Sequence, residues 1–378
     1  AVQQEGTRLP MTLVSSAIDP LPADGPGMDA VKSFACTEVP ESDAEKMKVL
    51  DTLQAGRALA ALCVVLRHAS VAPVVTSVSV PPSVLMLFEL GILGVDFFFV
   101  LSGFIILYSY QNAPVSIKTY ALKRVSRVYV PYWPIGIAMV LAYSLTTLES
   151  GHHDWSMITS LFLLPTGRPP ALSVAWTLVH EILFYAIFCL YFISRRWFPW
   201  IVAAWSAGML VSAALHGFAQ PYTPGPIGLL LSPLNLEFVM GMICVVLLTR
   251  VPRQFAPILI CAGLAGTLAS AAMFAVLSTP RELCGLMMAV AVLGFALVDD
   301  KLRRFIPPGL VFLGGASYAL YLIHHPVISV ASRIYENHHW VSSVLFLVCV
   351  SVVAGVLYHV LVENPVLRRV RMPIKAKA

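Results

Sequence analysis

Charged residues are scarce in this sequence. Asp, Glu, Lys and Arg make up 12% of its 378 residues, whereas they make up about a quarter of a typical soluble domain. Hydrophobic residues account for 58%. This composition leaves little room for a large soluble domain, and it indicates an all-α, polytopic bundle of transmembrane helices.

A cysteine framework and a signal peptide are also lacking. The seven cysteines lie mostly inside apolar runs, without a CxxC or metal-site spacing, so we interpret them as small buried hydrophobes. Residues 1–48 are polar and have neither the basic nor the apolar region of a signal peptide, which predicts a disordered or weakly structured tail. The net charge of +5 does not indicate a nucleic-acid partner, because the basic residues lie in short loops.

Long apolar runs dominate the rest of the chain and define a transmembrane domain over residues 49–365. Most Lys and Arg residues outside these runs fall in alternate loops and in a basic tail, residues 366–378, which predicts that both termini are cytoplasmic. Hydropathy predicts about ten spans, at 53–75, 87–110, 128–148, 174–194, 199–217, 233–250, 256–277, 283–298, 311–332 and 341–362.

Ionisable residues inside the predicted spans mark candidate functional sites, because such groups are costly to place in a membrane. The first span contains Arg57 and, eleven residues later, His68. Counting along the spans places Asp96, Glu181 and His324 at a depth similar to that of His68. Histidines and carboxylates at one level predict an acid–base site or a proton relay.

A second polar layer is predicted near the cytoplasmic surface. Arg57 lies at this level, and Arg124 and Arg127 are spaced to share one face of a helix. Guanidinium groups in fixed geometry suit a phosphate-rich ligand, although contact with anionic membrane lipids or a purely topogenic role would also explain them. The neighbouring His152, His153 and Asp154 resemble a metal cluster, but consecutive residues ligate poorly without other partners, so we expect no metal site there.

Several sequence blocks resemble the acyltransferase-3 family of integral membrane O-acyltransferases. They follow the family's order over about residues 50–365. Two shorter blocks, LLPTG at 163–167 and NLEFVMG at 235–241, are similar to exopolysaccharide acetyltransferases of the ExoZ type. The main blocks are the Arg57 to His68 pair, GVDFFFVLSGF at 94–104, KRVSRVYVPYW at 123–133, WTLVHEILFY at 176–185 and ASYALYLIHHP at 316–326.

This resemblance implies transfer of an acyl group, usually acetyl from acetyl-CoA, to a sugar hydroxyl of an exopolysaccharide, a lipopolysaccharide or a related glycan precursor. It also implies a bacterial cytoplasmic membrane as the location. We expect His68 to act as general base or acyl acceptor, with Asp96 or Glu181 orienting its ring. The expected contacts to acetyl-CoA are Arg57, Arg124, Arg127, Phe98 and Ser102, and the expected contacts to the acceptor are Trp176, His324 and Tyr185.

Other functions fit part of the same pattern. His68, Glu181 and His324 could form the relay of a proton-coupled secondary transporter, but no internal repeat links the two halves of the chain. A scaffold within a polysaccharide export complex is a third possibility. Within the acyltransferases, the transferred group could be succinyl or another acyl group.

Overall fold

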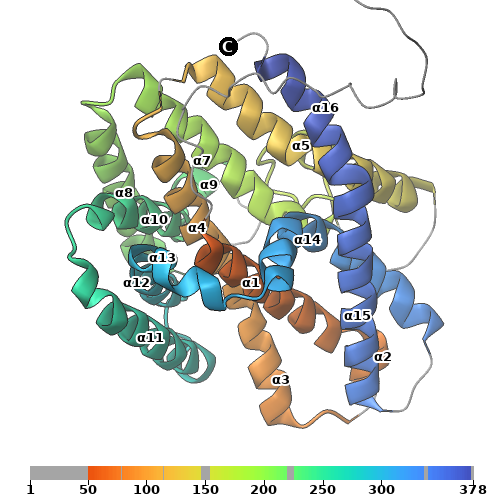
Figure 1. Ribbon diagram of the computed structural model, residues 1–378. Helices are drawn as coiled ribbons and strands as arrows, with labels where there is room; N and C mark the ends of the chain where they lie inside the picture. The colour runs from red at the N-terminus through yellow and green to blue at the C-terminus, as the bar shows by residue number, and fades with distance from the viewer. Residues whose placement is uncertain are drawn as a thin grey trace, which may run out of the picture. The chain divides into compact units, whose positions relative to one another are not determined.

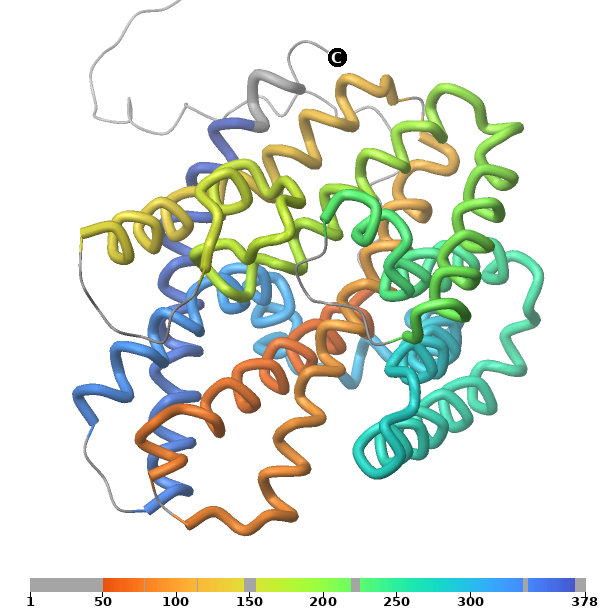
Figure 2. The backbone as a smooth tube through the Cα atoms, turned by 180° about the vertical axis from the view of Figure 1, so that it is seen from behind, coloured from red at the N-terminus to blue at the C-terminus, as the bar shows by residue number. Residues whose placement is uncertain are grey.

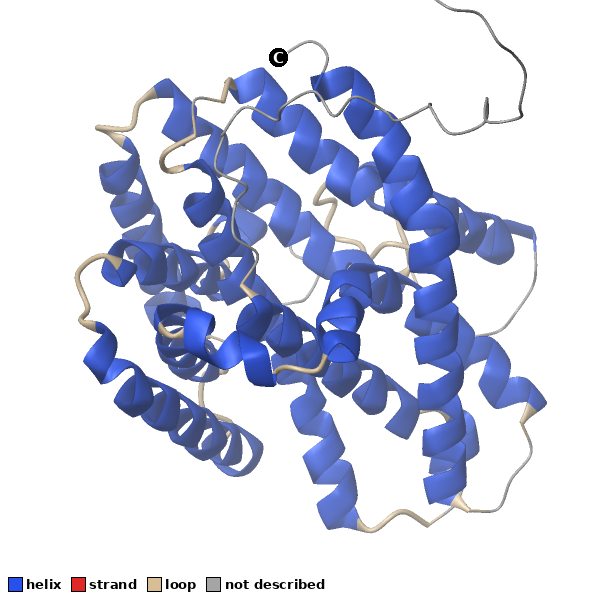
Figure 3. Ribbon diagram, in the orientation of Figure 1, coloured by secondary structure: helices blue, strands red, loops and turns tan. Residues whose placement is uncertain are grey.

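The computed structural model describes residues 50–77, 79–113, 115–145, 154–218, 225–335 and 339–375. All regular secondary structure in these ranges is helical, which confirms the predicted all-α class (Figures 1 and 3). The predicted tail at 1–48 and the pair His152–His153 lie outside the described residues.

The bounds of the helices are as follows. The longer helices are α1 (Asp51–Ser70), α3 (Pro82–Glu89), α4 (Leu93–Tyr110), α5 (Ile117–Leu145), α7 (Trp176–Ile193), α8 (Phe198–His216), α10 (Leu236–Leu248), α11 (Ala256–Leu277), α12 (Glu282–Leu297), α14 (Pro308–Ile334), α15 (Trp340–Tyr358) and α16 (Asn364–Lys375). The short helices are α2 (Pro73–Thr76), α6 (Met157–Phe162), α9 (Pro226–Leu230) and α13 (Asp299–Leu302). Single turns are η1 (Leu90–Ile92), η2 (Ser173–Ala175), η3 (Pro233–Asn235), η4 (Arg253–Phe255), η5 (Arg303–Phe305) and the π-helical η6 (His359–Glu363).

Eight described helical segments are long and apolar enough to cross a membrane. A ninth candidate is the bent pair Glu282–Leu297 and Asp299–Phe305, which turns by 69°. Together with the more polar α1, these segments correspond to the ten predicted spans. The bundle is therefore the predicted one, while the cytoplasmic location of both termini stays a prediction.

The first predicted span, 53–75, is not one continuous helix. Helix α1 ends at Ser70, and Ala72 has extended backbone angles (φ −67°, ψ 145°) before Pro73 begins α2. A residue that precedes proline disfavours the helical conformation, because the proline ring clashes with its backbone. His68 consequently lies two residues from the end of α1 and not in the middle of a helix.

Glycines allow the central helices to approach closely. Helices α4 and α10 cross where a Cβ atom on Gly103 would lie 1.9 Å from the Phe238 carbonyl oxygen. At the crossing of α1 and α14, a Cβ atom on Gly314 would lie 2.0 Å from the carbonyl oxygen of Gln54. Small residues permit such contacts in membrane bundles, and they bring α1 against α14 and α4 (Figure 2).

Candidate active site

A cavity of about 190 Å³ lies between α1, α4, α5, α7 and α14. Its wall combines apolar residues with tyrosines, arginines and one carboxylate. The structure therefore brings together all five residues predicted to bind the acyl donor. The predicted site residues that line the cavity are Arg57, Phe98, Ser102, Arg124, Arg127, Glu181 and Tyr185.

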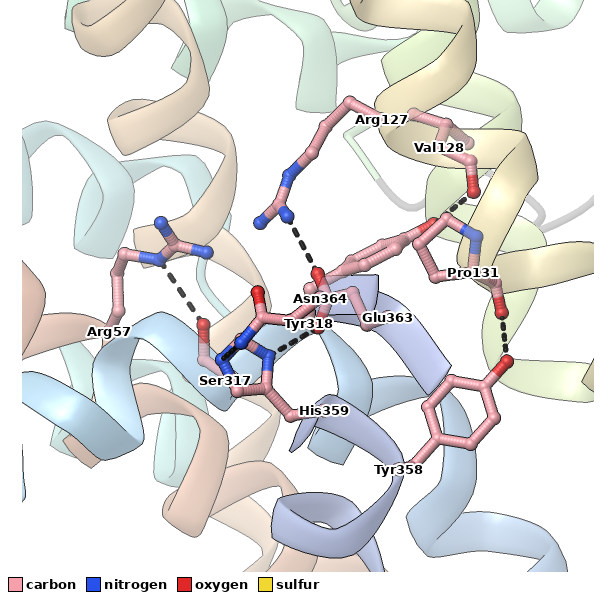
Figure 4. A network of polar contacts seen from close by, with 10 residues as sticks. All are labelled: Arg57, Arg127, Val128, Pro131, Ser317, Tyr318, Tyr358, His359, Glu363 and Asn364. Carbon is pink, nitrogen blue, oxygen red and sulfur yellow. Dashed lines mark hydrogen bonds and ion pairs between the residues drawn. The ribbon is translucent and has the colours of Figure 1, made fainter. Parts of the chain in front are cut away.

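Three arginines face this cavity from two helices. Arg124 and Arg127 both line it, which confirms that they share one face of α5. Arg57 Nε donates to Ser317 Oγ at 3.2 Å, and the Arg57 and Arg127 guanidinium groups point toward the same space (Figure 4). The Arg124 guanidinium lies 5.1 Å from the centre of the Tyr110 ring, and its buried Nε has no hydrogen-bond partner among the described residues.

Glu181 lies in this arginine group and not beside His68. Its carboxylate accepts a hydrogen bond from Tyr185 Oη and interacts electrostatically with all three arginines. Arg57 and His68 are eleven residues apart on α1, which is about 16 Å along a helix. The structure thus places Glu181 with the arginines, and no described contact joins it to His68, so an orienting role of Glu181 stays a prediction.

Three histidines form a second group beyond the cavity. The His68 and His324 rings have centroids 4.9 Å apart, and the His68 and His325 centroids are 5.6 Å apart. His324 is fully buried, whereas His68 is partly exposed. His325 Nε2 lies 3.4 Å from Ser173 Oγ. The sequence predicted that His68 and His324 share one level, and the structure places them in contact.

Backbone contacts assign the protons of these rings. His68 Nδ1 lies 2.9 Å from the Val64 carbonyl oxygen, and His324 Nδ1 lies 3.1 Å from that of Leu320. A carbonyl oxygen only accepts hydrogen bonds, so both Nδ1 atoms carry the proton. His324 Nε2 is then an acceptor, and it lies 3.4 Å from the Nδ1 atom of His68. His68 Nε2 keeps a free lone pair and makes no hydrogen bond within the part of the chain that the structure describes.

Tyr321 connects the cavity to the histidine group. Its ring lines the cavity and has its centroid 5.8 Å from that of His324. Its hydroxyl donates to the Val174 carbonyl oxygen at 2.7 Å and lies 2.8 Å from Thr177 Oγ1. A molecule that extends from the arginines along the cavity would therefore reach Tyr321 next to the histidines.

Asp96 belongs to a third, separate group. Arg281 Nε and NH2 donate to its two carboxylate oxygens at 2.9 and 2.7 Å, and the Asp96 side chain is fully buried. Glu237 and Glu282 are also buried and interact electrostatically with this pair. The structure pairs Asp96 with Arg281, and no described contact joins it to His68, so an orienting role of Asp96 stays a prediction.

Replacing Arg281 by alanine should lower the free energy of unfolding by about 3–5 kcal/mol, because Asp96 then becomes a buried charge without its partner. Thermal unfolding in detergent measures this loss. Arg168→Ala is the matched control, since its ion pair with Asp154 joins side chains that are 61% and 73% exposed. Equal unfolding midpoints for the two variants would contradict a structural role for the buried pair.

Trp176, predicted to bind the acceptor, packs edge-on against Phe99 and His180 instead of lining the cavity.

The sequence analysis did not predict Tyr321 beside the histidines, or Glu237 and Glu282 beside Asp96 and Arg281. The cost of carboxylates inside a membrane could have indicated the two glutamates. Among the described residues, no group of three or more His, Cys, Asp or Glu side chains is arranged to hold a metal ion.

Fold and site together define an integral membrane protein with a buried cationic cavity beside a histidine group.

A family model described as an acyltransferase domain matches residues 50–360. The exopolysaccharide production protein ExoZ of Rhizobium meliloti (strain 1021) is 29% identical over 308 residues, which cover 75% of this chain and 92% of ExoZ. The acyltransferase MdmB of Streptomyces mycarofaciens is 28% identical over 363 residues, which cover 84% and 92% of the two chains. No solved structure gives a significant match. The chain belongs to the acyltransferase-3 family of membrane acyltransferases.

Proposed function

We propose that this protein transfers an acetyl group from cytoplasmic acetyl-CoA to a sugar hydroxyl of an exopolysaccharide, a lipopolysaccharide or a related glycan precursor in the bacterial cytoplasmic membrane. The observation that carries the proposal is the cavity, which joins three arginines at one level to Tyr321 beside the histidines. The similarity to a protein named for exopolysaccharide production supports a glycan acceptor.

The arginines are suited to the phosphates of acetyl-CoA. Their guanidinium groups present several N–H donors in fixed directions, and such charge-assisted hydrogen bonds to phosphate are among the stronger ones. Glu181 offsets part of this positive charge while the cavity holds no anionic donor. The thioester end of a bound donor would then lie toward Phe98 and Tyr321, away from the phosphates.

His68 would perform the chemistry through Nε2. In direct transfer, Nε2 removes the proton of the acceptor hydroxyl while that oxygen attacks the thioester carbonyl, and the CoA thiolate leaves and takes up a proton. In the alternative route, Nε2 attacks the thioester carbonyl first and expels the CoA thiolate, which takes up a proton. The acceptor hydroxyl then attacks the acetyl-imidazole, and its proton passes to Nε2 as the acetyl group leaves the ring. Both routes need the Nδ1–H tautomer that Val64 and His324 favour.

Incubation of the purified protein with radiolabelled acetyl-CoA tests this function. A transferase releases free CoA and moves label onto the protein or an added glycan acceptor. A secondary transporter would instead move a solute into liposomes without consuming acetyl-CoA. Comparing polysaccharide acetylation in cells with and without the gene then identifies the acceptor sugar.

Arg124→Ala should raise KM for acetyl-CoA about tenfold or more, because it removes charge-assisted contacts of about 1.5–3 kcal/mol to the donor phosphates. The value of kcat should change less, since contacts far from the reacting carbon contribute mostly uniform binding. Steady-state kinetics of CoA release measure both constants, with exposed Arg168→Ala as the control. An inverted topology with unchanged KM would instead show that Arg124 is a topogenic charge.

A further inference from the structure

The last membrane helix is interrupted next to the arginine cavity. Helix α15 ends at Tyr358, residues His359–Glu363 form a π-helical turn, and α16 begins at Asn364. Such turns are rare and occur frequently at functional sites, because the extra residue turns side chains in a direction that a regular α-helix does not allow. Here the turn places the buried Glu363 side chain against α5.

A directed chain of hydrogen bonds starts at this turn and ends on Arg127 (Figure 4). Asn364 Nδ2 donates to His359 Nε2 at 3.0 Å, so the proton of the His359 ring is on Nδ1. His359 Nδ1 donates to Glu363 Oε2 at 2.6 Å, and Arg127 NH1 donates to Glu363 Oε1 at 2.6 Å. Both oxygens of the Glu363 carboxylate are thereby engaged.

Arg127 is the member of this chain that faces the cavity. Its side chain is 27% exposed, whereas that of Glu363 is 0% exposed. The guanidinium has five N–H donors, so the bond to Glu363 leaves others for a ligand beside Arg57. A long side chain that is already fixed loses less conformational freedom when it binds, and this lowers the cost of binding.

We propose that Glu363, oriented by His359 and Asn364, is a positioning residue that fixes Arg127 for the phosphates of the acyl donor. This inference rests on the proposed function. Glu363 acts through Arg127 and does not itself line the cavity.

A neighbouring contact separates this role from simple helix anchoring. Tyr358 Oη donates to the Pro131 carbonyl oxygen at 2.7 Å and so also ties the last membrane helix to α5 (Figure 4). The tie lies one helical turn from Arg127 and has no bond to it among the described contacts. Tyr358→Phe therefore removes an anchor between the same helices and leaves the chain to Arg127 intact.

Glu363→Gln is the conservative variant. In this variant the glutamine amide nitrogen can donate to His359 Nδ1, while its carbonyl oxygen still accepts from Arg127. The proton of the His359 ring is then on Nε2, which donates to the side-chain carbonyl oxygen of Asn364. The geometry of the chain survives and the carboxylate charge is lost. Glu363→Ala removes both the charge and the acceptor.

The test measures KM for acetyl-CoA, kcat and the unfolding midpoint in the full-length protein. We expect Glu363→Ala to raise KM about tenfold with little change in kcat, as for loss of one charge-assisted contact. Glu363→Gln should keep KM within about threefold of wild type, and Tyr358→Phe should leave KM unchanged. An unchanged KM in Glu363→Ala, or an equal rise in Tyr358→Phe, overturns the proposal.

Glu363→Ala leaves Arg127 without its ion-pair partner, so this single variant can fail to fold. A double variant keeps the test valid in that case. Arg127→Ala with Glu363→Ala removes both charges, and its KM should match that of Arg127→Ala alone, because residues acting through one contact are not additive. A further rise in the double variant would show that Glu363 acts elsewhere. If the wild-type protein does not turn over acetyl-CoA, the proposed function fails and this inference fails with it. If the wild-type protein turns over acetyl-CoA and the Glu363 variants have a normal KM, only the inference fails.

Discussion

Replacing His68 by alanine should reduce acyl transfer by at least about a thousandfold, within the range that general acid–base and nucleophilic groups contribute. The change removes the Nε2 lone pair on which both chemical routes depend. It removes few packing contacts, because the ring is partly exposed near the end of α1. CoA release by the purified variant and acetylation of the host polysaccharide measure the loss.

Two measurements show whether this variant is still folded. Its unfolding midpoint, and the KM for acetyl-CoA of any residual activity, should stay near the wild-type values. Arg57, which lines the cavity, lies about 16 Å along α1 from His68, so we expect donor binding not to depend on the imidazole. Acid-quenched wild type also separates the two routes, because label on the protein appears only with an acetyl-imidazole intermediate. Wild-type rates in His68→Ala would remove His68 from the mechanism.

Apolar run length predicted the helices closely. Eight of the ten predicted spans fall on helical segments with similar bounds, because twenty apolar residues have few alternatives to a membrane helix. One exception is the first span, where Pro73 interrupts the run. The other is helix α5, which begins at Ile117, eleven residues before its predicted start, and so includes Arg124 and Arg127.

The composition of the site was less predictable, because hydropathy gives the approximate depth of a residue but not the direction in which it faces. Depth placed Glu181, Asp96 and His68 together, whereas the structure turns each toward a different partner. Asp96 meets Arg281 at a sequence separation of 185 residues, and Arg127 meets Glu363 at a separation of 236. Such pairs depend on helix rotation and neighbour order, which a single sequence does not contain.

The structure also changes the expected role of His324. The sequence assigned it to acceptor binding, but its Nε2 faces His68 Nδ1 at 3.4 Å and its side chain is fully buried. We therefore expect His324 to hold the His68 tautomer and to stabilise the ring when Nε2 gains a proton or an acetyl group. A carboxylate has this role in other histidine-based acyl transfers.

His324→Ala should lower kcat about a hundredfold, because Val64 alone would then hold the His68 ring. KM for acetyl-CoA should stay near wild type, since His324 does not line the cavity. His324→Gln should recover part of the activity, because its carbonyl oxygen can accept from His68 Nδ1.

His325→Phe is the control for this prediction. It keeps a ring beside His68 without a hydrogen-bonding nitrogen, and it should lower kcat less than tenfold. A raised KM for the glycan acceptor with unchanged kcat in His324→Ala would return His324 to acceptor binding, whereas a kcat loss partly restored by glutamine would assign it to the orientation of His68.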